Sequence, residues 1–407
     1  MRAVINILGI VIILGAMLVI SKDRKAVKKE IILKAMAVQF IIAFLLVKFP
    51  LGKLVVSKVS DVVTRVLDYG KDGISFVFGS LGFAGAPTGF IFATQVLGNI
   101  VFLSSLVGAL YYLGILGFIV KVIGKGVGKI LGTSQVESFV AVANMFLGQT
   151  ESPILISKYL GIMTESEIMV VLVSGMGSMS ATIIGGYVAL GIPMEYLLIA
   201  STLVPMGSIA VSKIIYPEIE ISKNVEDVSM DNKGDNENLI GAVTEGAMNG
   251  MNSAMAIGAS LIAIIGLVAL VNGILGAIGG AVGIGSLSLE KIFAYVFSPL
   301  GFIMGLSGDD ILLAGQLLGS KLVLNEFVAF QQLGQVIQGL GERTALILSI
   351  SLAGFANISS MGICIAGIAA LCPEKRGVLS RLVFKAMIGG FVVSVLSAMI
   401  VGLITMF

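Results

Sequence analysis

The stretch that decides the fold reads Leu147-Gly148-Gln149-Thr150-Glu151-Ser152-Pro153, a polar interruption of an apolar run from 134 to 160. A second apolar run, from 311 to 340, is interrupted in the same way by Lys321-Leu322-Val323-Leu324-Asn325-Glu326-Phe327. Each half of each run has about a dozen residues, whereas a membrane-spanning helix needs about 20. Each run therefore predicts a re-entrant helical hairpin, which enters and leaves the membrane on one side.

The composition of the whole chain is that of an integral membrane protein. Of its 407 residues 57% are hydrophobic and 12% are charged, against roughly 25% charged in soluble domains. The chain has no His, which argues against zinc, iron and His-based catalysis. A formal net charge of +2 argues against a nucleic-acid partner held by bulk basicity. The expected class is all-α, with membrane lipid as its surroundings.

Hydropathy and charge predict eight transmembrane helices. The connector 21–30 carries five Lys or Arg residues, so the positive-inside rule places it in the cytoplasm and the N-terminus outside. The turn at Pro193 carries none, and the connector 372–385 is again basic. The predicted crossings are 3–20, 31–49, 90–113, 165–190, 194–215, 253–275, 342–371 and 384–406.

Two further segments are amphipathic and predict helices that lie in the membrane interface. Apolar residues recur at spacings of three and four between Leu51 and Asp72, and lysines fall on one stripe between Ile115 and Ile130. We expect five parts: helices with an interfacial helix in 1–113, a first repeat in 114–215, a cytoplasmic connector in 216–252, a further helix and an external helix in 253–304, and a second repeat in 305–407. Within the connector, the acidic segment 216–238 is expected to be flexible.

Each hairpin is followed by a span that is itself interrupted. Gly and Ser residues at 174–180 break the fourth span, and 354–360 break the seventh. The order of hairpin and broken helix therefore occurs twice, and the basic connectors predict that the two copies are inverted. Paired interruptions in two inverted halves are typical of a transporter with its binding site near the membrane midplane.

Glu151 and Glu326 are the main candidates for a functional site. An ionised carboxylate in an apolar run costs several kcal/mol unless it is paired or hydrated. A structural alternative is pairing with a lysine, Lys158 or Lys321. The expected polar lining consists of amides, hydroxyls and two carboxylates, with no Arg cluster. This composition favours a neutral ligand rich in hydroxyls. The lining residues are Gln149, Thr150, Glu151, Asn325, Glu326, Asn357 and Ser360, with Phe327 and Phe355 as apolar faces.

Three motifs resemble those of the concentrative nucleoside transporters, in particular of the bacterial branch with eight spans. They are Gly148-Gln149-Thr150-Glu151, then Lys321 with the run Asn325-Glu326-Phe327-Val328-Ala329-Phe330, and Gly354-Phe355-Ala356-Asn357-Ile358-Ser359-Ser360. The resemblance covers nearly the whole chain. It implies a multi-pass protein of the bacterial plasma (inner) membrane, assembled as a homotrimer, in which each protomer has a scaffold and a moving transport domain.

The resemblance also implies roles for individual residues. The nucleobase falls to Gln149, Thr150 and Glu151 with Ile183 as an apolar neighbour, and the ribose falls to Glu326, Asn357 and Ser360. Gly148 and Phe355 complete the expected substrate site, and the small Gly148 makes adenosine a candidate beside uridine and cytidine. A sodium ion, the expected cofactor, is implied between the side chains of Asn144 and Ser178 and the carbonyls of Leu147 and Met179.

The function expected from these features is import of nucleosides coupled to a sodium gradient, by an elevator-type movement of the transport domain. Oxygen ligands suit a desolvated sodium ion, whereas Glu151 or Glu326 would carry the proton in a proton-coupled symporter. Rival interpretations are a transporter of another neutral polar solute, a channel and an intramembrane enzyme. Neither carboxylate lies in an Asp-Gly or Gly-x-Gly-Asp type context, so we expect that the protein is not an enzyme.

Overall fold

The computed structural model describes residues 2–83, 85–220, 225, 228, 236–281, 283 and 287–407. Within these ranges the chain is helical and has no strands. The α-helices in chain order are α1 (Arg2–Val19), α2 (Lys29–Val47), α3 (Pro50–Phe78), α4 (Phe92–Gln95), α5 (Leu97–Tyr112), α6 (Ile115–Leu131), α7 (Gln135–Ala143), α8 (Ser152–Leu155), α9 (Ser157–Leu160), α10 (Glu165–Gly177), α11 (Ala181–Ala189), α12 (Met194–Ile215), α13 (Leu239–Ala281), α14 (Leu289–Ile303), α15 (Asp309–Val323), α16 (Glu326–Val336), α17 (Glu342–Leu352), α18 (Ile358–Leu371) and α19 (Arg376–Ile404). Short 3₁₀ turns follow α3, α16 and α18.

Seven helical stretches in the described part of the chain are long and apolar enough to cross a membrane. The prediction from sequence was eight. The seventh predicted span, 342–371, is not among the seven. It is interrupted, as the sequence predicts, and consists of α17 and α18 with 11 and 14 residues.

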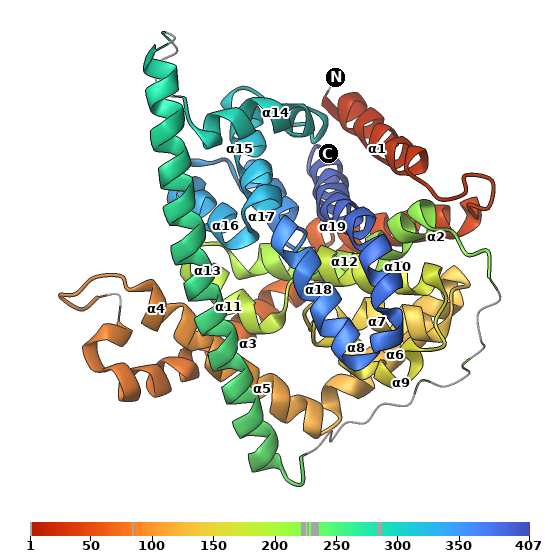
Figure 1. Cartoon of the computed structure of the whole chain (residues 1–407), viewed down its shortest axis with the longest axis horizontal. Coiled ribbons are helices and arrows are strands. Elements are labelled where there is room, and N and C mark those ends of the chain that lie inside the picture. The colour runs from red at the N-terminus through yellow and green to blue at the C-terminus, as the bar shows by residue number, and fades with distance from the viewer. Residues whose placement is uncertain are drawn as a thin grey trace.

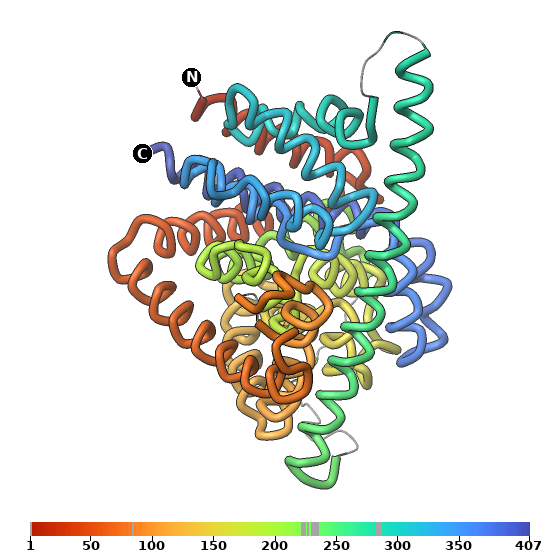
Figure 2. The backbone as a smooth tube through the Cα atoms, turned by 90° about the vertical axis from the view of Figure 1, so that its left-hand side faces the viewer, coloured from red at the N-terminus to blue at the C-terminus, as the bar shows by residue number. Residues whose placement is uncertain are grey.

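The helices fall into a buried centre and an exposed periphery. The α10–α11 pair, α12 and α19 have most of their length buried, whereas α1, α2 and α13 have most of theirs exposed. In Figures 1 and 2, α13 stands along one side of the molecule, and the two chain ends lie at the same end of the bundle. A chain of this kind has a packed central body and an outer layer of helices that offers apolar surface to its surroundings.

The longest helix, α13, extends further toward the N-terminus than the predicted span 253–275 and includes the last part of the predicted cytoplasmic connector, 239–252. It begins at Leu239 and runs for 43 residues, about 65 Å at 1.5 Å per residue. Its buried residues, among them Ala242, Gly246, Gly250 and Ala254, recur every four positions and pack against α5. A Cβ on Gly246 would lie 2.5 Å from the carbonyl oxygen of Ser104, so only small residues allow this approach.

The small residues that pack against α5 therefore stabilise a helical conformation in 239–252, although this segment also contains polar residues. Several other residues of the predicted connector, 221–224, 226–227 and 229–235, lie outside the described residues. A similar difference occurs before the last span, where α19 begins at Arg376 within the predicted basic connector. Its basic side chains reach outward from the helix: Arg381 bonds to Glu165, and the Lys385 ammonium donates to the Ile20 carbonyl at 2.8 Å.

The two predicted hairpins differ in regularity. In the second, α15 and α16 pack against each other and meet at Leu324 and Asn325. In the first, α7 is followed by a turn and then by α8 and α9, each only four residues long. One continuous second arm was expected, but Ile156 separates the two pieces with a φ of −112° and a ψ of 13°, outside the helical region.

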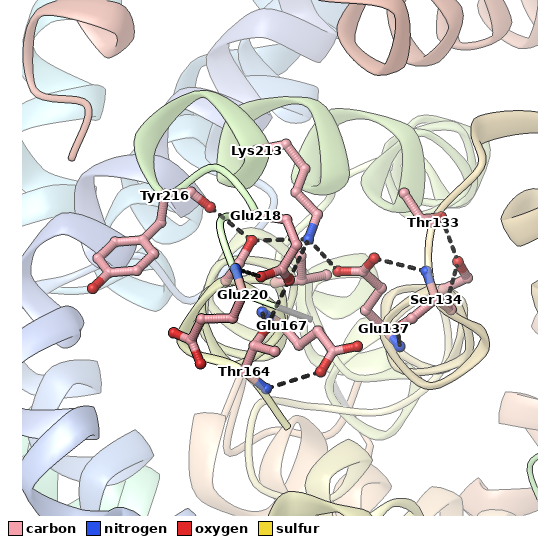
Figure 3. A network of polar contacts seen from close by, with 12 residues as sticks. Thr133, Ser134, Glu137, Thr164, Glu167, Lys213, Tyr216, Glu218 and Glu220 are labelled. Atoms are coloured by element: carbon pink, nitrogen blue, oxygen red, sulfur yellow. Dashed lines mark hydrogen bonds and ion pairs between the residues drawn. The ribbon is translucent and has the colours of Figure 1, made fainter. Parts of the chain in front are cut away.

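A buried ionic network joins α7, α10 and α12 at one end of the central body (Figure 3). The Lys213 ammonium of α12 lies 2.6 Å from the Glu137 carboxylate and 3.9 Å from that of Glu218. It also donates to the Ser166 hydroxyl at 2.9 Å, and the Thr164 hydroxyl donates to Glu218 at 2.7 Å. Glu137 lies in the first turn of α7, so this network fixes the start of the first hairpin against α10 and α12.

Candidate functional site

All nine residues expected to bind the substrate line one cavity of about 360 Å³. This volume is within the range of small-molecule sites. The cavity is built from the tip of the first hairpin, the two helix breaks, the start of α16 and one face of α13. The nine residues are Gly148, Gln149, Thr150, Glu151, Ile183, Glu326, Phe355, Asn357 and Ser360.

Two asparagine N-caps fix the starts of the helices that carry polar residues into the cavity. The Asn325 side chain accepts from the Val328 N–H at 2.9 Å and begins α16. The Asn357 side chain accepts from the Ser360 N–H at 2.9 Å and begins α18. An Asn side chain at the N-cap satisfies a backbone N–H that the helix leaves free. The motif residues therefore start helices at the cavity wall, and Glu326 lies in the first turn of α16.

The two helix breaks contact each other. The Phe355 N–H of the second break donates to the Ser178 carbonyl of the first at 3.0 Å, and the Ala181 N–H joins the first break to the Phe146 carbonyl of the first hairpin at 2.8 Å. Gly354 has a φ of 132°, and a Cβ there would lie 2.8 Å from the Gly177 carbonyl oxygen. A glycine is required at this position because another residue would be both strained and in collision.

The two carboxylates are hydrogen-bonded but not ion-paired in the described part of the chain. Glu151 accepts from the Gly148 N–H at 3.1 Å and from the Ser180 hydroxyl at 3.2 Å, both through Oε2. Glu326 accepts from the Tyr187 hydroxyl at 3.3 Å and from the Asn357 amide at 3.0 Å. The structural alternative, a direct ion pair with Lys158 or Lys321, is therefore wrong, although Lys321 still interacts electrostatically with Glu326. Both carboxylates border the cavity.

The amide of Gln149 is held from both ends. Its Nε2 donates to the Ser360 hydroxyl at 3.2 Å, and its Oε1 accepts from the Cys364 thiol at 3.1 Å. These contacts link the tip of the first hairpin to α18. Gly175 of α10 packs against the Gln149 backbone, since a Cβ at position 175 would lie 3.0 Å from the Gln149 Cα.

The four residues expected to bind sodium lie together behind the cavity. Asn144, Leu147, Ser178 and Met179 are buried, and they stand where α7 and α10 end. The Asn144 Nδ2 donates to the Ser174 hydroxyl of α10 at 2.9 Å, while its Oδ1 is buried without a hydrogen-bond partner. This oxygen is free to bind a ligand, and oxygen is the ligand that a hard cation prefers. The residue set therefore fits a sodium ion.

Several residues at or behind the cavity wall were not predicted from the sequence. Tyr187 is fully buried, stacks on Phe330 at 4.3 Å between ring centroids and bonds to Glu326. No pattern singled it out, since a Tyr in an apolar helix is usually part of the core. The break at 178–180 did point to Ser180, but not to its bond with Glu151. The helix α13 contributes Ser253 and Ser260, which were assigned to the scaffold.

Comparison with family models covers most of the chain. A model described as "Na+ dependent nucleoside transporter C-terminus" matches residues 196–402, and its N-terminal counterpart matches residues 8–81. A third, described as "Nucleoside recognition", matches residues 93–194 and includes the first hairpin tip. The family description names sodium as the ion on which transport depends.

Individual proteins agree with the family models. An "Uncharacterized transporter" of Haemophilus influenzae is 39% identical over 99% of this chain and 98% of its own. The "Nucleoside permease NupC" of Helicobacter pylori is 36% identical over 98% of this chain and 97% of its own.

A solved structure titled "Structure of CNTnw in an inward-facing substrate-bound state" superposes with a TM-score of 0.95 at 36% identity, covering 100% of this chain and 98% of that one. The homologues are transporters and permeases rather than enzymes, and the protein is a multi-pass membrane protein. The chain therefore belongs to the concentrative, Na+-dependent nucleoside transporter family.

Proposed function

We propose that this protein imports nucleosides across the bacterial inner membrane by symport with sodium, in an elevator-type movement of a transport domain. The observation that carries the proposal is a cavity where two carboxylates that form no ion pair with a lysine face amides and hydroxyls from both sequence repeats. A carboxylate accepts from two hydroxyls at once, and a ribose offers two on adjacent carbons.

The two sides of the cavity suit the two parts of a nucleoside. Glu326, Asn357 and Ser360 supply acceptors and donors for the ribose. Gln149, Thr150 and Glu151 border the side where a nucleobase edge would be recognised, with Ile183 and Phe355 as apolar surfaces for its ring. We assign uridine and cytidine as substrates, and adenosine as a further one because Gly148 leaves space beside the base.

Sodium coupling follows from the position of the ion site behind the first hairpin tip. The ion would be held by the Asn144 and Ser178 side chains and the Leu147 and Met179 carbonyls. Asn144 ends α7, and the tip that follows carries Gln149 and Glu151 into the cavity. Ordering this tip by sodium raises the affinity for nucleoside, and by linkage nucleoside raises the affinity for sodium equally.

The division into a buried centre and an outer layer supports a moving and a stationary part. We assign the two repeats, with both hairpins re-entrant, to the transport domain. The helices of 1–113 and 253–304 form the scaffold, and the interfacial helices α3 and α6 act as hinges or rests for the movement. Their exposed apolar faces suit lipid and the partner subunits of a homotrimer.

Uptake of labelled uridine into proteoliposomes tests the proposal. An inward sodium gradient should drive accumulation, and an equal potassium gradient should not. Accumulation driven by a proton gradient alone would indicate a proton-coupled symporter. Failure of nucleosides to compete, with uptake of another neutral solute, would contradict the substrate assignment. A thermal-shift series with uridine, adenosine and sodium would separate binding of the ligand from binding of the ion.

A further inference from the structure

Lys321 is a fully buried lysine that bears no ion pair in the described part of the chain. It has 0% of its surface exposed. Its ammonium donates to the Ser351 carbonyl at 2.9 Å and to the Ser394 hydroxyl at 2.6 Å, and lies 5.6 Å from the centre of the Phe391 ring. Each of these partners is neutral. The Glu326 carboxylate attracts the ammonium electrostatically but forms no direct ion pair with it. A buried charge without a counter-charge in contact is expensive, so the ammonium needs further compensation.

The other deeply buried lysine shows the usual solution. Lys213 is 4% exposed and has the Glu137 carboxylate at 2.6 Å (Figure 3). Lys213 therefore belongs to an ordinary buried ion pair, whereas Lys321 does not. The difference is not a matter of burial depth, since both side chains are removed from solvent.

Helix ends supply the compensation at Lys321. The residue lies in the last turn of α15, which ends at Val323. Its partner Ser351 lies in the last turn of α17, which ends at Leu352. The C-terminal end of a helix carries unpaired carbonyl groups and a partial negative charge. Two such ends converge on one ammonium group.

The first repeat has the same arrangement without a lysine. There α7 ends at Ala143 and α10 ends at Gly177. Asn144 stands at the end of α7 and reaches Ser174 in the last turn of α10. Asn144 precedes the tip residue Glu151 by seven positions, and Lys321 precedes Glu326 by five. The first hairpin helix and the first half of the broken helix therefore meet end to end in both repeats.

We propose that the Lys321 ammonium is the built-in counterpart, in the second repeat, of the sodium ion that the first repeat binds. This inference rests on the sodium site assigned under the proposed function. Lys321 is a positioning residue: it holds the end of α15 against the end of α17. In this way it sets the relative positions of Glu326, at the start of α16, and Asn357, beyond the break. The ribose side of the cavity is assembled without an external cation, and only the nucleobase side depends on sodium.

Three substitutions in the full-length protein, reconstituted in proteoliposomes, test the proposal. Lys321→Met removes the cation, Lys321→Arg retains it, and Lys321→Asn replaces it with the side chain found at 144. With Lys321→Met at saturating sodium, the KM for uridine should rise about tenfold. The rise should be much smaller for 2′,3′-dideoxyuridine, which lacks the ribose hydroxyls. Lys321→Arg should keep a KM nearer that of the wild type.

Lys321→Asn should create a second requirement for sodium. Its uptake should increase sigmoidally with sodium, with a Hill coefficient above the value of about 1 expected for one site. An unchanged sodium curve in this variant, or equal losses for uridine and dideoxyuridine in Lys321→Met, would overturn the proposal. A purely structural lysine would lower uptake of both ligands equally and leave the sodium curve unaltered.

A milder pair of variants covers the case in which these proteins do not fold. Ser394→Ala removes one acceptor from the ammonium, and Ser397→Ala removes a hydroxyl one turn along α19 that bonds Gln39 instead. Only Ser394→Ala should raise the uridine KM with the same dependence on the ribose hydroxyls, and equal effects of the two would overturn the proposal. The wild-type protein tests the function separately, since absence of sodium-driven uridine uptake there refutes the proposed function before any variant is compared.

Discussion

The two halves of the cavity differ in how completely their polar groups are already bonded. In the second half both oxygens of Glu326 accept from a side chain, Tyr187 or Asn357, and α15 and α16 are regular. In the first half both bonds to Glu151 fall on one oxygen. The Asn144 Oδ1 has no partner, and the second arm of the hairpin is fragmented.

The difference in bonding indicates which half of the cavity changes when an ion binds. A fully bonded network is rigid, whereas an open coordination position and short helical turns leave room for ordering on binding. We therefore interpret the second half as preformed for the sugar and the first half as the sodium-sensitive part. The predictions below test this asymmetry.

The largest effect is expected for Glu326→Gln. The amide retains the size of the side chain but loses the charge that accepts from ribose hydroxyls, Tyr187 and Asn357. Uridine kcat/KM should fall about 100-fold, equivalent to about 3 kcal/mol, with the sodium half-saturation little changed. The control is Glu342→Gln, at the exposed start of α17, which should transport normally. Normal uridine uptake by Glu326→Gln would remove this residue from the site.

Asn144→Ala is expected to act on the first half. The substitution deletes the unpartnered buried oxygen and the bond to Ser174. The sodium concentration for half-maximal uptake should rise about tenfold, as measured by uridine uptake over a sodium series. Asn252→Ala, at an exposed position on α13, provides the matched control. An unchanged sodium concentration for half-maximal uptake would favour coupling to protons instead of sodium.

Tyr187→Phe should weaken the second half moderately. The hydroxyl donates to Glu326 at 3.3 Å, and removal of one such hydrogen bond costs about 1 kcal/mol. The uridine KM should therefore rise about fivefold, while the ring keeps its stacking on Phe330. Tyr295→Phe, on an exposed surface, should change nothing. If both variants transport like the wild type, the hydroxyl does not contribute to the orientation of Glu326.

The smallest effect is expected for Cys364→Ala. The thiol is a weak donor to the Gln149 amide, at 3.1 Å. Its loss should raise the KM for nucleosides by no more than about threefold. Because Gln149 belongs to the nucleobase side, the change should be the same for uridine and 2′-deoxyuridine. A change restricted to one of these two would mean that Cys364 acts on the sugar side, and the comparison of halves would need revision.

Particular residues show how far the sequence could go in predicting the site. Gln149, Glu151, Glu326 and Asn357 were found because polar groups in apolar runs are expensive, and all of them line the cavity. Tyr187 was not found, because its role depends on Glu326, which is 139 positions away in the chain. The lysine pairing considered for Glu326 failed because the Lys321 ammonium instead reaches Ser351 and Ser394 on two other helices.

The fold shows the same division. The amino-acid pattern was enough to predict a helical membrane protein and the positions of its polar interruptions, because hydropathy and the cost of buried charge are local properties of a segment. Three features became known only from the folded chain: α13 is one helix of 43 residues, α8 and α9 are separate turns, and Lys321 bonds to two other helices. Those outcomes depend on close contacts between segments far apart in the chain, and no local pattern encodes them.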